Sequence, residues 1–256
     1  MLKIADKNDF SALTEFLNSG IISLRILSYL TAYGTDKYFV KFFIQYNEEG
    51  IQGVISFFED SALIEATEKA DFGEILSFLS MNYYSVLSCR KDVADSLGFK
   101  NYETKQGYAY SGDDIENSAE NISEENLKTV YRIISENIPG SFENTKEAYL
   151  SFMSDYTYRE RRNLARGKCI IENNSVVACA LTSAETEDNA LLSGVAAAKS
   201  CKGKGYGKKV VISLVNELLS RGKKSYVIAL NDSAKGFYEH IGFEKDDLIA
   251  YINRKD

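Results

Sequence analysis

Several features that define common classes of protein are missing from this chain of 256 residues. No apolar run approaches the roughly 20 residues that a membrane-spanning helix needs, so we expect no membrane association. The single histidine, His240, argues against a histidine-rich metal site and against a Ser-His-Asp triad. The cysteines show neither a CxxC motif nor another metal-ligand spacing, and we expect no metal site. These cysteines are Cys89, Cys169, Cys179 and Cys201.

A secretory signal is also missing, because the segment Met1–Asp6 is charged early and contains no long apolar stretch. We therefore expect a cytoplasmic protein. Cys169 and Cys179 fall on neighbouring strands of a predicted hairpin, but in a cytoplasmic chain reduced thiols are favoured over a disulfide.

Positively charged residues are scarce in the first half of the chain. The net charge of −7 argues against a general nucleic-acid binder, and we expect no nucleic-acid partner. Residues 1–118 carry 10 Lys and Arg against 18 Asp and Glu, whereas residues 119–256 carry 20 against 19. An anionic ligand is therefore expected in the second half.

The most informative segment is Lys202–Gly207, which holds three alternate glycines just before an amphipathic helix. Backbone amides without side-chain cover at a helix N-terminus form a site for phosphate. No acid occurs between residues 199 and 209, where five lysines gather: Lys199, Lys202, Lys204, Lys208 and Lys209. A glycine-rich surface turn with solvated lysines is the alternative. A P-loop or dinucleotide fold is disfavoured, because there is no Gly-Lys-Ser/Thr and the glycines read GxGxG.

The second half predicts a regular order of elements. Helices are expected from Ser123 to Pro139, over 146–153, from Gly207 to Gly222 and over the segment around Phe237; strands are expected over 167–171, 176–181, 190–196, 226–230 and 248–252. Asn173-Asn174 is the expected hairpin turn.

The first half repeats this order more faintly. Helices are expected over 10–17, 72–79 and 93–97, and strands over 38–46, 51–58, 63–66 and 84–89. In place of the glycine loop the first half has Thr67–Asp71, which is acidic and would repel phosphate. The polar segment Ser111–Ser118 separates the halves, so domains are predicted over 1–112 and 119–256.

Two motifs give the second half a family resemblance. Gly194-Val195-Ala196 followed by Lys202–Lys208 resembles the cofactor motif of the GNAT superfamily, the Gcn5-related N-acetyltransferases, with lysine replacing the usual Arg or Gln at position 202. Asn231–Phe243 resembles the Asn-x-x-Ala-x-x-Phe-Tyr-x-x-x-Gly-Phe ending of the same family. The resemblance implies an α/β (α+β) chain of two tandem GNAT-like domains. Each would be a mixed, mostly antiparallel sheet flanked by helices, and the first would be a degenerate copy without a cofactor loop.

The resemblance also implies a cofactor site for acetyl-CoA. The backbone of Val195 and Ala197 would pair with the pantetheine arm, and the glycine loop would hold the pyrophosphate. The implied cofactor residues are Val195, Ala196, Ala197, Lys202, Gly203, Lys204, Gly205, Tyr206, Gly207, Lys208 and Asn231. For Asn231, capping of the last helix is an equal alternative.

Tyr238 is the candidate catalytic acid. A phenol with a pKa near 10 suits proton donation to a thiolate of similar basicity, and the family places a tyrosine here close to the cofactor sulfur. The alternative is that Tyr238 only packs beside Phe237. By alignment on Gly-Phe, the first half has Ala94 at this position, which cannot donate a proton.

The general base is less well indicated. Glu185, Glu187 and Asp188 precede the strand that carries Val195 and are either a base or a solvated turn. His240 is expected at the surface. Arg159, Arg161 and Arg162 either bind an acidic substrate group or form a solvated helix end.

The predicted function is direct transfer of an acetyl group from acetyl-CoA to a primary amine of a small molecule or peptide. A protein that binds or senses acyl-CoA without turnover is the alternative. A homodimer is left open.

Overall fold

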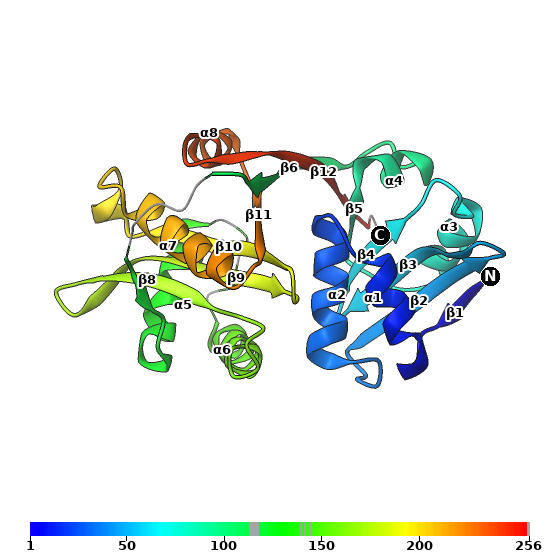
Figure 1. Cartoon of the computed structure of the whole chain (residues 1–256), viewed down its shortest axis with the longest axis horizontal. Helices are drawn as coiled ribbons and strands as arrows, with labels where there is room; N and C mark the ends of the chain where they lie inside the picture. The colour runs from blue at the N-terminus through cyan, green and yellow to red at the C-terminus, as the bar shows by residue number, and fades with distance from the viewer. Residues whose placement is uncertain (113–117, 139, 141, 144, 255–256) are drawn as a thin grey trace. The chain divides into compact units, whose positions relative to one another are not determined.

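The computed structural model describes residues 1–112, 118–138, 140, 142–143 and 145–254 (Figure 1). The chain forms two compact units built from non-contiguous segments. Unit 1 comprises Met1–Tyr108, Ala229–Lys235 and Lys245–Asp256, and unit 2 comprises Ala109–Ile228 and Gly236–Glu244. The linker predicted over Ser111–Ser118 includes residues 113–117, which lie outside the described residues, so the boundaries 1–112 and 119–256 stay a prediction.

Unit 1 is a mixed, mostly antiparallel sheet in the order β1-β2-β3-β4-β5-β12, in which only β4 and β5 run parallel. Helices α1 and α2 lie on one side of the sheet, and α3 and α4 on the other (Figure 1). Its elements are β1 (Leu2–Ile4), α1 (Phe10–Phe16), α2 (Ile21–Tyr33), β2 (Val40–Asn47), β3 (Gly50–Phe58), β4 (Ser61–Ala66), α3 (Phe72–Met81), β5 (Val86–Arg90), α4 (Lys91–Ser96), the start of β6 (Glu103–Tyr110) and most of β12 (Phe243–Asn253).

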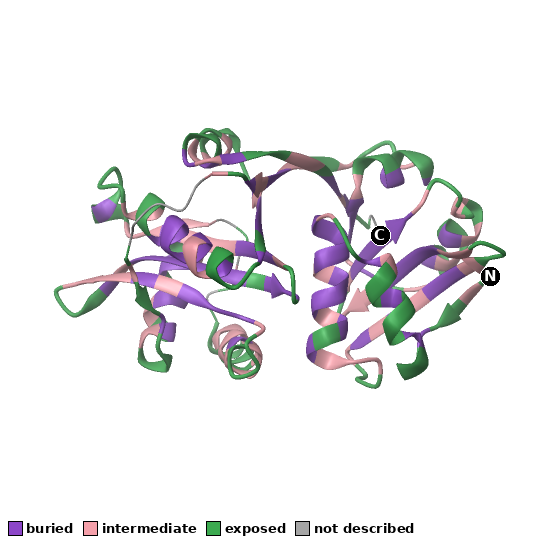
Figure 2. Ribbon diagram, viewed as in Figure 1, coloured by how far each residue is buried: buried purple, intermediate pink, exposed green. Residues whose placement is uncertain are grey.

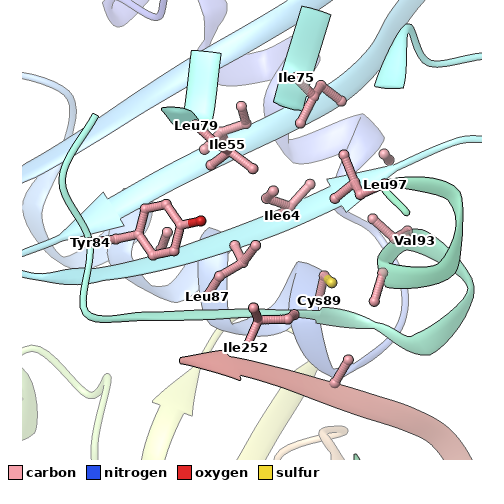
Figure 3. Close-up of a cluster of buried hydrophobic side chains, with 14 residues drawn as sticks. Ile55, Ile64, Ile75, Leu79, Tyr84, Leu87, Cys89, Val93, Leu97 and Ile252 are labelled. Carbon is pink, nitrogen blue, oxygen red and sulfur yellow. The ribbon is translucent and has the colours of Figure 1, made fainter. Parts of the chain in front are cut away.

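The core of unit 1 includes a strand that comes from far along the sequence. Residues Ile249–Asn253 of β12 pair antiparallel with Val86–Arg90 of β5. Figure 3 shows Ile252 of β12 packed beside Leu87 in the same apolar cluster as Ile64. The exposed fraction of Ile252 is 5 %, so the sheet of unit 1 depends on β12 for part of its core.

Unit 2 is a second mixed, mostly antiparallel sheet, in the order β11-β10-β9-β8-β7, in which only β10 and β11 run parallel. Helix α7 covers one face of β8–β10 and α5 the other (Figure 1), and the helix sides that face the sheet are buried (Figure 2). Its elements are β7 (Glu120–Asn121), α5 (Leu127–Asn137), α6 (Lys146–Glu160), β8 (Gly167–Glu172), β9 (Ser175–Glu185), β10 (Asn189–Ala197), α7 (Tyr206–Ser220), β11 (Lys224–Ala229) and part of α8 (Asp232–His240).

The predicted fold class is confirmed in both units, and so is the β8–β9 hairpin. Asn173 and Asn174 adopt left-handed φ values of 49° and 60°, as a tight hairpin turn of this kind requires. Cys169 and Cys179 lie directly opposite each other on β8 and β9 as free thiols. Pro139, the predicted end of α5, lies outside the described residues.

Helix α2 was not expected from the sequence. Nine of its residues are buried, on all sides of the helix, so no 3.6-residue alternation marks it. Gly20 precedes it with a φ of 83° and Gly34 ends it with a φ of 67°, so the left-handed conformations at both ends explain these glycines.

Candidate active site

The glycine loop leads directly into α7. Gly203 and Gly205 both have a φ of 80°, in the left-handed region that favours glycine, and a Cβ on either would meet open space. Gly205 is the N-cap of α7 and offers no side chain to the first turn. The glycines are therefore explained by backbone conformation, and the N-terminus of α7 stays uncovered.

The backbone amides at this helix start are available to an anion. The helix begins with the bond from the Lys209 amide to the Gly205 carbonyl at 3.1 Å, and the Lys204 amide donates to the Cys201 carbonyl at 3.4 Å. Within the described part of the chain, the amides of Gly203 and of residues 205–208 have no acceptor. Clustered free amides at the positive end of a helix dipole bind phosphate.

The side chains of the loop strengthen its positive potential. Lys202, Lys204 and Lys208 are exposed. The Lys204 ammonium lies 4.0 Å from the Cys201 thiol and 5.9 Å from the centre of the Tyr206 ring. The hydroxyl of Tyr206 donates to Glu172, so the side chain is engaged within the chain. Its backbone amide is the group that Tyr206 offers to an anion at the start of α7.

Strands β10 and β11 separate just before the loop. Their parallel register runs from Asn189 opposite Lys224 to Leu192 opposite Val227 and ends there. A bulge follows between Ser193 and Ala196, where Gly194 has a φ of 57° and a Cβ would lie 2.8 Å from a methyl carbon of Ile134. Among the described residues, the segment 193–197 therefore pairs with β9 on one edge, and its other edge has no strand partner.

The three residues predicted from this segment divide into two roles. Ala196 pairs with Cys179 of β9 and is buried in the cluster that α5 covers. Val195 and Ala197 are half-buried and lie on the strand edge that β11 leaves. An extended chain could add to that edge by backbone hydrogen bonds.

Tyr238 lies in the part of α8 that belongs to unit 2. The exposed fraction of the residue is 7 %, and its ring meets Phe237 at 5.1 Å and Phe243 at 5.5 Å between centroids. Burial raises the pKa of the Tyr238 phenol, which therefore stays protonated at physiological pH. Phe237 in turn borders the start of α7, because a Cβ on Gly207 would lie 3.7 Å from its ring. The structure thus brings the aromatic pair toward the glycine loop.

Asn231 acts as a helix cap. Its side-chain oxygen accepts a hydrogen bond from the Ala234 amide at 2.9 Å, at the first turn of α8. The residue falls in the segment Ala229–Lys235 of unit 1, and a role in cofactor binding stays a prediction. His240 lies exposed at the end of α8, as expected.

Glu185 is neither a free general base nor a solvated turn residue, the two roles that the sequence left open for it. Its exposed fraction is 1 %, and its carboxylate accepts from Arg166 Nη2 at 2.8 Å and from the Thr182 hydroxyl at 2.6 Å, with the Lys223 ammonium at 3.3 Å. The carboxylate is a buried structural ion, so it is not a solvated turn residue and is not free to accept a substrate proton. Glu187 is exposed.

The basic run at the end of α6 is occupied within the chain. Arg159 pairs with Asp155 at 2.5 Å and donates to the Ser183 carbonyl at 2.9 Å. Arg161 pairs with Glu124 at 2.6 Å. The Arg162 guanidinium lies 3.7 Å from the centre of the Tyr158 ring and donates to the Tyr158 carbonyl at 3.1 Å. These contacts favour a helix-end role over recognition of an acidic substrate.

Comparison with known proteins identifies the family of the second half of the chain. A model of the acetyltransferase (GNAT) family matches residues 127–243, which include the loop, the bulged strand and Tyr238. Residues 127–243 form a GNAT acetyltransferase domain. The comparison with curated proteins gives no match.

Solved structures extend the likeness to the whole chain. A GNAT-family acetyltransferase from Colwellia psychrerythraea is 14 % identical with a TM-score of 0.64, covering 99 % of this chain and 100 % of that one. A tandem GNAT protein from the clavulanic acid biosynthesis pathway is 9 % identical with a TM-score of 0.65, covering 100 % and 99 %. A GCN5-related N-acetyltransferase from Sphaerobacter thermophilus is 12 % identical with a TM-score of 0.63, covering 99 % and 95 %. At these identities the neighbours show the fold, and unit 1 is part of it. Across the described residues, no helix has both the length and the apolar character to cross a membrane.

Proposed function

We propose that the GNAT domain of this chain transfers an acetyl group from acetyl-CoA to a primary amine of a small molecule or peptide. The observation that carries the proposal is the uncapped start of α7, whose free amides follow directly after the open edge of β10. A ligand that joins a diphosphate to an extended arm with amide groups fits both features.

The residues of unit 2 fit such a ligand in three places. The amides of Gly203 and residues 205–208 would hold the diphosphate, and the exposed lysines would add attraction. The free edge at Val195 and Ala197 would hold the amide-bearing arm. When bound, acetyl-CoA supplies a thioester whose acyl group the acceptor amine takes up. An N–H group at the β10 bulge would donate to the acyl oxygen.

Tyr238 would complete the proton balance. The C–N bond forms as the C–S bond breaks, the amine loses one proton to solvent, and Tyr238 donates its phenolic proton to the departing thiolate. Tyr238 then regains a proton from water. Burial keeps the Tyr238 phenol protonated and ready to donate, but by raising its pKa it also lowers the driving force for proton transfer to a thiolate, so bound cofactor must bring that pKa down.

The test compares the wild type with Tyr238→Phe in a thiol-release assay over a panel of amines. We expect kcat to fall about 100-fold or more while the affinity for CoA, measured by calorimetry, stays within about 3-fold. Tyr226→Phe is the matched control, since Tyr226 is also a buried tyrosine of unit 2. Failure of CoA to bind the wild type would overturn the proposal, and an unchanged kcat in Tyr238→Phe would remove Tyr238 from it.

The alternative, a protein that binds acyl-CoA without turnover, is favoured by one observation. Glu185, one of the three carboxylates considered as a base, is committed to Arg166 and Lys223. If the wild type binds acetyl-CoA tightly but releases no thiol with any amine, this alternative replaces transfer.

A further inference from the structure

Unit 1 contains a pocket of about 510 Å³ that plays no part in the proposed transfer. Its volume lies in the range that small ligands occupy, roughly 300 to 1,000 Å³. Five of its eight lining residues are aromatic, and two are charged. The lining consists of Tyr38, Phe39, Lys41, Phe43, Phe57, Glu59, Asn82 and Tyr83.

The floor of the pocket is one face of the β2–β3 pair. Lys41 lies directly opposite Phe57, and Phe43 follows Lys41 two residues along β2, on the same face. Phe78 of α3 packs against Phe43 at 4.7 Å between ring centroids and against Phe57 at 6.3 Å, which closes one side. The floor is therefore an aromatic surface that also carries Lys41.

The walls are aromatic but stand open to solvent. Tyr38 precedes β2 and has an exposed fraction of 90 %, and Tyr83 follows α3 with an exposed fraction of 72 %. Large rings held at the surface beside an aromatic floor are costly to leave in water. They suit a flat ring that would lie between them.

The two charged groups lack partners of their own. Among the described residues, neither the Lys41 ammonium nor the Glu59 carboxylate forms an ion pair or a side-chain hydrogen bond. The Glu59 amide donates to the Phe39 carbonyl at 2.9 Å, which sets Glu59 two pairs beyond Lys41 and Phe57, at the turn after β3 where its φ is 52°. Diagonal neighbours of this kind lie roughly 7 to 8 Å apart. A ligand with a carboxylate and an ammonium on one carbon would fit between them.

We propose that this pocket binds an aromatic amino acid. The ligand's carboxylate pairs with Lys41, its ammonium with Glu59, and its ring lies on Phe57 between Tyr38 and Tyr83. The pocket belongs to unit 1 alone, so the proposal stands apart from acetyl-CoA binding in unit 2.

The absence of tryptophan from the chain gives a direct test. L-tryptophan serves as the probe, because its fluorescence is read without a protein tryptophan signal. We expect saturable binding, with tryptamine and indole-3-propionate each about 10-fold weaker, since each lacks one of the charged groups. Glycine, which lacks a ring, should not compete.

Variants locate the site. Lys41→Gln and Glu59→Gln should each weaken L-tryptophan about 10-fold, and Tyr83→Ala about 3-fold, while Lys100→Gln at an exposed site has no effect. Tyr83 is exposed enough that its removal leaves folding unaffected. All four should keep the wild-type affinity for CoA. No saturable binding would overturn the proposal, and so would binding that survives Lys41→Gln and Tyr83→Ala, because the probe would then lie elsewhere, for example at an acceptor site in unit 2.

Discussion

The two units place a helix in the same position and finish its N-terminus in opposite ways. In unit 2, α7 follows β10 and starts at Gly205, with no side chain over its first amides. In unit 1, α3 follows β4 and starts at Asp71, whose carboxylate accepts from the Glu74 amide at 2.9 Å. The Asp71 amide is itself bonded to Gln45 at 2.9 Å. One helix start is open to an anion, and the other already holds a carboxylate.

The gap between the parallel strands differs in the same sense. In unit 1 the register of β4 with β5 ends at Ile64 opposite Cys89. Arg90 then reaches across, pairing with Glu65 and donating to the Ala66 carbonyl at 3.2 Å. In unit 2 no such bridge is recorded between the described residues beyond Leu192 and Val227. The comparison teaches that a few side chains decide whether this fold leaves a binding edge or closes it.

The largest effect is expected from removing the buried charge of unit 2. Glu185→Gln leaves Arg166 and Lys223 short of their shared anion, which should lower the free energy of unfolding by about 3 to 5 kcal/mol. Denaturant unfolding checks this, with the exposed Glu187→Gln as control at less than about 0.5 kcal/mol. If instead kcat collapsed with stability unchanged, Glu185 would be the missing base.

The stability of unit 1 should depend on pH because of its buried acid, Glu65. Burial raises the pKa of Glu65 to about 7 despite the neighbouring Arg90. Between roughly pH 4.5 and 7 the unfolded chain has lost this proton and the folded chain has kept it, so stability falls as pH rises through that window. Relative to Glu65→Gln, the wild type should lose up to about 3 kcal/mol across it. Glu68→Gln, on the exposed turn, should follow the wild type, and a constant difference between wild type and Glu65→Gln would contradict the prediction.

A carboxylate at the open helix start should convert unit 2 to the behaviour of unit 1. Gly205→Asp is expected to weaken CoA binding about 100-fold, because it caps the free amides and repels phosphate. Gly205→Asn is the matched control, since Asn tolerates the left-handed φ of 80° without the charge. Calorimetry with CoA should rank the variants wild type, Asn, Asp; equal loss in both variants would show that the added negative charge is not responsible.

The smallest effect is expected for the reverse change in unit 1. Asp71→Ala removes the cap of α3 and should cost about 1 kcal/mol of stability, measured by denaturant unfolding. CoA stoichiometry should stay unchanged, because Arg90 still fills the strand gap. A second equivalent of bound CoA would mean that the cap alone distinguishes the two units.

The sequence predicts what is local and periodic. The glycine loop, the hairpin at Asn173-Asn174 and the helix with Val211 and Leu214 on one face follow from patterns that a few residues carry. Helix α2 was not predicted, because its burial on all sides removes the periodic signal. The structural role of Glu185 was not predicted, because its partners Arg166 and Lys223 lie far away in sequence. Nothing in the local sequence distinguishes a buried ion from a solvated one. The pairing of β12 with β5 is equally non-local.

That pairing has a consequence for biosynthesis. The ribosome makes β5 long before β12, and all of β7–β11 is translated in between. The nascent unit 1 therefore waits with one flank of β5 unpaired and its apolar cluster short of Ile252. Translation order alone would make the amino-terminal unit the last to close, with a strand edge open to pairing with other chains until β12 emerges.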